Sequence, residues 1–254
     1  MSNERERLLD RLFAIGESLS RRESALALIG LGSVGLELER LDSYSDLDFF
    51  TIVRPGHKAD YLDDLSWLAD VAPIAYCFRN TRDGYKLLYE DGIFCEFAVF
   101  EEAELAQIPF APGRVVWRAP GVPETIGSPP DTRREAPEEP PAEWLLGEAL
   151  TNLYVGLLRE HRGERLTAMR FIQGHAADRI LALVERLQPA RGGQRDPFTP
   201  ERRFEARYPD MAAILPEMLQ GYSRNRESAR AALAFLDSHF ELNEAMKAAV
   251  LALC

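Results

Sequence analysis

The stretch GLGSVGLELERLDSYSDLDFFTIV, residues 30–53, carries most of the information about fold and chemistry in this chain. It places Gly32-Ser33 after the apolar run Ala25–Leu31, and Asp46-Leu47-Asp48 at the start of the run Asp46–Val53. Both runs are short and bounded by charge or glycine, which is typical of buried strands. The twelve residues between Ser33 and Asp46 are enough for a turn and a short helix. We therefore predict a strand, a Gly-Ser turn, and a second strand that two aspartates open.

The two aspartates predict a metal site. Alternate residues of a strand point to the same side, so Asp46 and Asp48 project together, roughly 6–7 Å apart along the strand. Two carboxylates this close repel each other unless a cation lies between them. Mg²⁺ prefers carboxylate oxygens and keeps waters and substrate phosphates in its coordination sphere. The alternative is an Asp-x-Asp pair that is simply exposed on a strand.

The Gly32-Ser33 step predicts a site for phosphate. Glycine lets the backbone approach an anion closely, and the Ser33 hydroxyl can donate to a phosphate oxygen. If Val34–Glu39 forms a short helix, its N-terminus adds partial positive charge. Tyr44 and Ser45 precede the first aspartate and would border a nucleotide. An ordinary turn is the alternative for both pairs.

Outward from this stretch, apolar strand patterns alternate with helical ones as far as residue 118. Asp91-Gly92 between two of the strand patterns is a hairpin signal. The patterns predict helices over Glu4–Leu19, His57–Ala69 and Glu101–Gln107, and strands over Val71–Phe78, Tyr85–Tyr89, Ile93–Phe100 and Arg114–Trp117.

The proline-rich segment 119–141, APGVPETIGSPPDTRREAPEEPP, interrupts this alternation. Proline removes a backbone donor and restricts the residue before it, so no helix or central strand runs through this spacing. We interpret 119–141 as a linker between an α+β domain, 1–118, and an all-helical bundle, 142–254. The bundle's predicted helices are Ala142–Arg162, Glu164–Leu187, Pro200–Tyr208, Met211–Leu219, Ser223–His239 and Glu241–Leu253.

Composition narrows the classes of protein. The 254 residues carry a formal net charge of −11, which disfavours a role in coating nucleic acid. Three cysteines cannot build a disulfide framework. No stretch approaches the roughly 18 apolar residues that cross a membrane. We expect a cytoplasmic protein that binds neither nucleic acid nor membrane.

The pattern Gly32-Ser33-x12-Asp46-x-Asp48 resembles the signature of the DNA-polymerase-β-like nucleotidyltransferase superfamily. The resemblance implies a small mixed sheet flanked by helices, and two aspartates that ligate Mg²⁺ on a nucleoside triphosphate. It also implies a third carboxylate from a later strand. Glu96 matches that place as the sole acidic residue within GIFCEFAVF, as general base or as ligand of a second metal. The alternative is a partly exposed glutamate on a strand face.

Two longer segments resemble the antibiotic nucleotidyltransferases. These are EDGIFCEFAVFEEAELAQIPF (90–110) and NLYVGLLREHRGERLTAMRFIQGHAADRI (152–180), which are most similar to the lincosamide type and more distantly to aminoglycoside adenylyltransferases. The resemblance implies transfer of a nucleoside monophosphate, generally AMP from ATP, to a hydroxyl of a small antibiotic. We expect the acceptor to bind between the two domains. We also expect the protein to form a homodimer.

The helical half offers further candidates. Glu164, Arg165 and Arg170 would reach phosphate or acceptor, although solvated helix charges are the alternative. Gln173 falls on an apolar helix face, where it points into a cleft or is a satisfied core amide. Arg170-x4-His175 resembles the ribonuclease motif of helical domains that pair with minimal nucleotidyltransferases in toxin–antitoxin systems. A nucleotide-sensing module without turnover is a third alternative.

Overall fold

The chain forms two compact units. The computed structural model describes residues 2–129, 139–192, 195–196 and 199–254. The units are Met1–Arg134 and Glu135–Cys254, and each has a hydrophobic core of its own. Residues 130–138 of the proline-rich segment lie outside the described residues.

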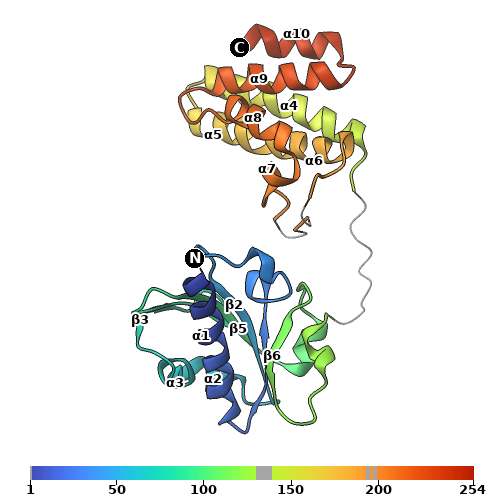
Figure 1. Ribbon diagram of the computed structural model, residues 1–254. Helices are drawn as coiled ribbons and strands as arrows, with labels where there is room; N and C mark the ends of the chain where they lie inside the picture. The colour runs from blue at the N-terminus through green and yellow to red at the C-terminus, as the bar shows by residue number, and fades with distance from the viewer. Residues whose placement is uncertain (1, 130–138, 193–194, 197–198) are drawn as a thin grey trace. The chain divides into compact units, whose positions relative to one another are not determined.

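The first unit is built on a six-stranded mixed sheet with the order β3-β4-β5-β2-β1-β6 (Figure 1). Neighbouring strands β2 and β5 are parallel, and the other neighbouring pairs are antiparallel. The sheet confirms the α+β expectation for this part of the chain. Its strands are β1 (Ala25–Gly30), β2 (Leu47–Val53), β3 (Ile74–Phe78), β4 (Gly84–Tyr89), β5 (Phe94–Glu101) and β6 (Arg114–Arg118).

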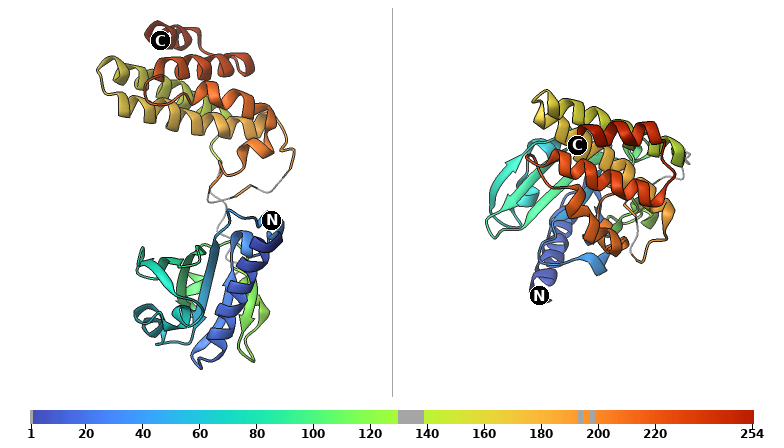
Figure 2. Two further views of the ribbon diagram at one scale, coloured as in Figure 1. Left: turned by 60° about the vertical axis from the view of Figure 1, so that its left-hand side comes forward. Right: turned by 90° about the horizontal axis from the view of Figure 1, so that it is seen from above.

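Three helices cover one face of this sheet: α1 (Ser2–Ser20), α2 (Lys58–Asp63) and α3 (Ser66–Ala69) (Figure 1). Helix α1 packs along β1 and β6, as the left view of Figure 2 shows. Alternate residues of β2 and β5 point into this core, among them Leu47, Phe49, Cys95 and Phe97. The residues between them therefore point to the opposite face.

The opposite face is covered over only part of its area. A smaller core of Leu26, Ala27, Ile29, Ile52, Phe100, Leu105, Phe110 and Ile126 closes it where β2 and β5 end. Ile126 lies in the 3₁₀ turn η4 (Glu124–Gly127), so this part of the proline-rich segment packs onto the first unit. We call the uncovered part, where β2 and β5 begin, the carboxylate face.

Several predicted helices are shorter in the structure. His57–Ala69 is interrupted at Asp64, whose carboxylate accepts from the Ser66 N–H, so α3 begins anew. The segment predicted as a helix over Glu101–Gln107 is the 3₁₀ turn η3 (Glu102–Ala106), and the Pro200–Tyr208 prediction is reduced to α7 (Phe204–Arg207).

The second unit is helical in all its regular elements among the described residues. Its core is built around α4 (Ala142–His161), which packs against the long helix formed by α5 (Arg165–Met169), η5 (Arg170–Ala176) and α6 (Ala177–Leu187). The remaining helices are α8 (Pro209–Met218), α9 (Asn225–His239) and α10 (Glu244–Leu253). Within the part of the chain that the structure describes, no helix combines the length and apolar character needed to span a membrane.

Segment η5 is a π-helical turn inside the long helix. Close packing accompanies it, because a Cβ on Gly156 of α4 would lie 2.5 Å from the Ile172 side chain. Gly156 thus lets α4 approach the widened turn. π-helical turns of this kind are rare and occur frequently at functional sites.

Candidate active site

The parallel pairing of β2 and β5 places Asp48 directly beside Glu96. The two residues are Cα partners in the register, and both point away from the helix-covered core. Partners in neighbouring strands lie about 5 Å apart, so their carboxylates share one patch of the carboxylate face. Forty-eight residues apart in the chain, Asp48 and Glu96 are neighbours because of this one strand pairing.

Asp46 lies directly before β2, two positions from Asp48. Asp46, Asp48 and Glu96 are all partly buried rather than freely exposed. The structure therefore brings Asp48 and Glu96 together on the carboxylate face and places Asp46 at the beginning of the same strand.

Both carboxylate oxygens of Glu96 have protein partners. The Asn80 amide donates to Glu96 Oε1 at 3.1 Å, and Lys86 Nζ lies 3.2 Å from Glu96 Oε2. Lys86 is the Cα partner of Glu96 across β4 and β5. Sequence reasoning did not identify Asn80 or Lys86, since only the antiparallel register of β4 with β5 brings Lys86 to this position.

Gly32 is the residue of the Gly-Ser turn nearest to the aspartates. A Cβ on Gly32 would lie 3.6 Å from Asp48 Oδ2, and the Leu31 N–H donates to the Asp48 carbonyl at 2.8 Å. The φ of Gly32 is +52°, a left-handed conformation that favours glycine. Among the described residues the Ser33 hydroxyl makes no hydrogen bond, so it can donate to a ligand.

The segment after Ser33 does not form the helix expected over Val34–Glu39. It consists of two 3₁₀ turns, η1 (Gly32–Val34) and η2 (Leu38–Arg40). A helix dipole therefore adds nothing here, and anion binding would rest on backbone N–H groups and the Ser33 hydroxyl.

Arg114 fixes this turn from β6. Its Nε and Nη2 donate to the Val34 carbonyl at 3.2 and 2.9 Å, and burial lowers the pKa of its guanidinium. The guanidinium carbon also lies 5.7 Å from the centre of the Phe13 ring. Because β6 reaches the turn only through the pairing of the sheet, no local sequence pattern indicates this contact.

Asp46 and Asp48 fit Mg²⁺ as a pair of ligands rather than as part of a complete set of protein ligands. In the described ranges, no three His, Cys, Asp or Glu side chains converge closely enough to hold a metal ion. Mg²⁺ is usually bound by one or two carboxylates together with substrate phosphates and water. Asp46 and Asp48 beside the Gly32 turn match that arrangement. The Glu96 oxygens are already engaged by Asn80 and Lys86, so Glu96 is not counted with this pair.

Tyr44 and Ser45 belong to a hydrogen-bonded turn. The Asp42 carboxylate accepts from the Tyr44 N–H at 2.8 Å, and the Ser45 hydroxyl accepts from the Asp42 N–H at 3.0 Å. The Tyr44 side chain is 95% exposed. The turn holds the loop that leads into Asp46 and leaves the tyrosine ring exposed.

The candidate site residues on the helical unit do not form one cluster of side chains with unused hydrogen-bonding groups. Gln173 uses its amide internally: Oε1 accepts from the Gly221 N–H at 2.7 Å and Nε2 donates to Asn225 Oδ1 at 2.7 Å. Glu164 pairs with Arg159 at 3.0 Å. These contacts favour a packing role for Gln173.

Arg165 and Arg170 remain on the surface of the same helix. Arg165 Nε lies 3.6 Å from Glu160 Oε1. Arg170 is exposed and has no hydrogen bond or ion pair within the described parts of the chain. Of the helical candidates, Arg170 is therefore the one with its full donor capacity available.

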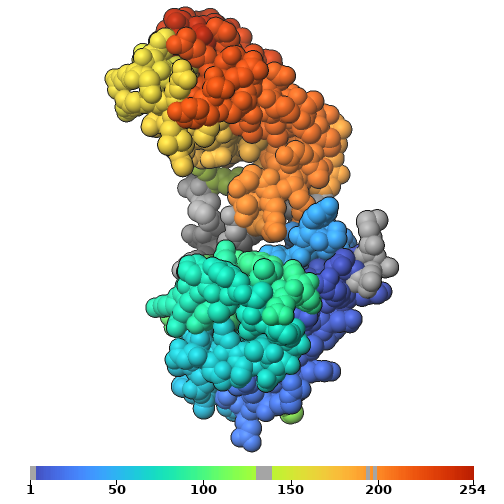
Figure 3. Space-filling model, turned by 90° about the vertical axis from the view of Figure 1, so that its left-hand side faces the viewer, coloured from blue at the N-terminus to red at the C-terminus, as the bar shows by residue number. Residues whose placement is uncertain are grey.

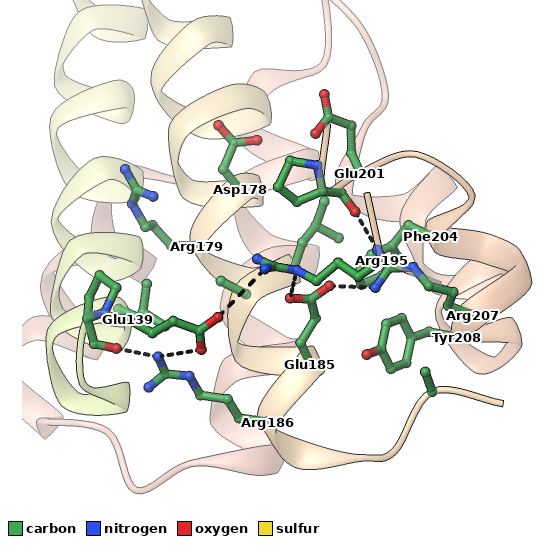
Figure 4. A pocket seen from close by; sticks show the side chains of 16 residues that line it. Glu139, Asp178, Arg179, Glu185, Arg186, Arg195, Glu201, Phe204, Arg207 and Tyr208 are labelled. Carbon is green, nitrogen blue, oxygen red and sulfur yellow. Dashed lines mark hydrogen bonds and ion pairs between the residues drawn. The ribbon is translucent and has the colours of Figure 1, made fainter. Parts of the chain in front are cut away.

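A pocket of about 630 Å³ lies within the helical unit (Figure 4). Its arginines are largely committed to neighbouring carboxylates. Glu185 accepts from Arg207 at 2.6 Å and lies 3.0 Å from Arg195, while Glu139 lies 3.8 Å from Arg186. Figure 4 shows these ion pairs among the side chains that line the pocket. They fasten the segment after α6 to the bundle, and none of the sequence-predicted site residues lines this pocket.

Among solved structures, the chain is similar to an aminoglycoside 6-adenyltransferase from Bacillus subtilis, with 12% sequence identity and a TM-score of 0.32. The match covers 95% of this chain and 89% of that one. No protein-family model and no curated protein sequence matches the chain.

Proposed function

We propose that this protein is a nucleotidyltransferase, which transfers a nucleoside monophosphate to a hydroxyl of a small molecule. The single observation that carries the proposal is the Asp48–Glu96 register beside the Gly32 turn. It unites two acids from separate strands with a glycine-bearing turn, which is what a phosphate-transfer site requires. The resemblance of Gly32-Ser33-x12-Asp46-x-Asp48 to the polymerase-β-like signature supports the same reaction.

The residues divide the chemical work as follows. The acceptor oxygen forms a bond to the α-phosphorus, the bond from that phosphorus to the bridging oxygen breaks, and pyrophosphate leaves. Glu96 takes the acceptor's hydroxyl proton at a carboxylate oxygen, as a general base within hydrogen-bond reach. The Gly32 turn and the Ser33 hydroxyl bind and orient the phosphates. Mg²⁺ held by Asp46 and Asp48 would supply Lewis-acid stabilisation of the charge on the leaving group.

The finer assignments belong to this proposal. We propose ATP as the nucleotide and an antibiotic hydroxyl, such as that of a lincosamide, as the acceptor, with an aminoglycoside as the alternative. The catalytic part is assigned to 1–118, and the helical part, 142–254, is proposed to contribute to substrate binding. A cytoplasmic location and a homodimer complete the proposal, with no nucleic-acid or membrane partner.

The decisive experiment replaces one carboxylate. Asp48→Asn should reduce pyrophosphate release from ATP by at least 10³-fold, on the scale of losing a major electrostatic contribution to phosphoryl transfer. Its melting temperature should stay within about 3 °C of wild type, because the side chain is only partly buried. Pyrophosphate release is measured with each nucleoside triphosphate against lincosamides, aminoglycosides and simple sugars.

Asp10→Asn is the matched control. Asp10 is exposed on α1, which packs on the opposite face of the sheet, so its neutralisation should leave turnover unchanged. Asp48→Asn with wild-type turnover would refute the assignment of the site.

One observation favours a second candidate, the ribonuclease of toxin–antitoxin type. Arg170 and His175 are both exposed and both lie in the π-helical turn η5. Because π-helical hydrogen bonds run from residue i to i+5, residues five apart lie closer to one face there than in an α-helix. This candidate requires RNA cleavage that Arg170→Ala and His175→Ala abolish, in the absence of ATP. A wild-type chain without such cleavage would exclude it.

A further inference from the structure

The sheet gives the two substrates opposite directions of approach. The Gly32 turn lies beside Asp48 on the β1 side of β2, whereas Glu96 lies on β5, on the other side. A triphosphate at Gly32 thus reaches the aspartates from the β1 side. The hydroxyl that Glu96 deprotonates must come from the opposite direction, over β4 and β3.

An aromatic strip lies in that direction. Phe78 is the Cα partner of Lys86, and Lys86 is the partner of Glu96, so the three residues form one row across the carboxylate face. Tyr76 is the partner of Leu88 on the same face. With strands about 5 Å apart, the Phe78 backbone lies about 10 Å from that of Glu96. This is within reach of a molecule of one or two rings.

A β-bulge turns this strip towards the carboxylate face. The register shifts between Ile74, paired with Tyr89, and Tyr76, paired with Leu88. Ile74 consequently packs against the helix-covered core, whereas Tyr76 and Phe78 point the other way. Their exposed fractions are 57% and 53%, although they are large aromatic residues. Figure 3 looks onto this part of the first unit, where β3 lies at the surface. Bulges re-aim side chains next to active sites.

We propose that Tyr76 and Phe78 form the platform that receives the acceptor, and that the acceptor is a hydroxylated ring with an apolar face and little positive charge. This deepens the proposed function and rests on it. Aromatic rings offer a flat apolar surface on which the C–H face of a pyranose or similar ring packs. Strands β3 and β4 read IAYCF and GYKLLY and contain no carboxylate. The sole charged side chain on these two strands is the cation Lys86, so a polycationic acceptor would find no carboxylate partner on the platform itself.

The test measures binding separately from turnover. The full-length protein is titrated calorimetrically, without nucleotide, with neutral phenyl and methyl pyranosides and with amino sugars that carry several charges. Wild type should bind at least one neutral pyranoside more tightly than the amino sugars. Phe78→Ala and Tyr76→Ala should each weaken that binding at least fivefold and leave the affinity for ATP unchanged. Leu251→Ala, at a side chain 50% exposed on α10, is the matched control and should bind as wild type does.

Two results would overturn the platform: no binding of any neutral pyranoside by wild type, or equal binding by the aromatic variants and wild type. Pyrophosphate release in the same samples keeps the proposed function separate. If wild type transfers nucleotide, and the aromatic variants bind pyranosides and transfer nucleotide as wild type does, only the platform is refuted. A wild type that binds pyranosides through Tyr76 and Phe78 but releases no pyrophosphate with any acceptor refutes nucleotidyl transfer.

Discussion

At the scale of single residues, backbone conformation is as important to the site as the charged side chains. Gly32 combines a positive φ with a close approach to the Asp48 carboxylate. Arg114 then holds the end of the turn through the Val34 carbonyl. The turn is therefore ordered before any ligand is bound, which reduces the entropy lost on phosphate binding.

Gly32→Ala should lower the free energy of unfolding by about 1 kcal/mol, because a side chain in the left-handed region is strained by roughly that amount. Urea denaturation of the full chain measures the change. Gly147→Ala is the opposite case: Gly147 is an exposed residue inside α4 with no atom within 4 Å of an added Cβ. There the change should stabilise by up to about 1 kcal/mol. Equal effects of the two substitutions would contradict the assigned backbone strain.

At the scale of elements, ion pairs join segments that lie far apart in the sequence. In the helical unit, the Arg207 side chain of α7 is 2% exposed and lies 2.6 Å from Glu185 of α6. Its guanidinium also stacks over Phe204 and Tyr208 at 5.4 and 5.3 Å. Arg207 therefore attaches α7 to the bundle together with the buried rings of Phe204 and Tyr208.

Arg207→Leu should destabilise the chain by about 1.5–3 kcal/mol, because Glu185 loses the nearer of its two arginine partners while Arg195 stays 3.0 Å away. Arg202→Leu removes an arginine whose side chain is 48% exposed, 3.3 Å from Asp196, and should cost less than about 1 kcal/mol. Chemical denaturation followed by circular dichroism compares the two variants. Similar losses of stability in the two variants would show that the buried Arg207 contributes no more to stability than the exposed Arg202.

A second ion-pair group links α2 to the β3–β4 turn and to η3. Lys58 Nζ lies 2.7 Å from both Asp83 and Glu104. Burial alone would raise the pKa of Asp83, but its hydrogen bonds to Lys58 and Arg82 outweigh burial and lower that pKa. A depressed carboxyl pKa stabilises the fold above the unfolded value of about 3.9, and this contribution is lost as the pH falls through the folded value.

Lys58→Met should therefore reduce stability at pH 7 by an amount on the order of 1 kcal/mol. It should also flatten the loss of stability below about pH 4, because Asp83 then titrates nearer its unfolded value. Urea unfolding at a series of pH values from 7 to 3 measures both effects. A variant that loses stability with acid as steeply as wild type would contradict this role for Lys58.

At the scale of the whole molecule, two separate cores suggest two cooperative units. The sheet unit and the helical unit each bury their own apolar clusters. Calorimetry should resolve two unfolding transitions. A nonhydrolysable ATP analogue with Mg²⁺ should raise the melting temperature of the sheet unit's transition alone, since a ligand stabilises the state that binds it. Hydrogen exchange assigns each unfolding transition to its unit. Equal shifts of both melting temperatures would indicate that the nucleotide also contacts the helical unit.

The sequence by itself determined the local part of this protein. Apolar periodicity and the Asp91-Gly92 turn predicted the strands to within about three residues, and the spacing around Gly32, Asp46 and Asp48 indicated the chemistry that we propose. The sequence also predicted helices that are longer than those in the structure. At Asp64, for example, a local hydrogen bond to the Ser66 N–H competes with the helix. These features depend on neighbours in the chain, which a sequence displays directly.

Only the tertiary structure decided which strands are neighbours. The parallel β2–β5 register, the Lys86–Glu96 contact and the bulge that turns Tyr76 and Phe78 outward all arise from pairings across long stretches of chain. The physical reason is that strand register is set by the packing of both sheet faces together. No local pattern contains that information.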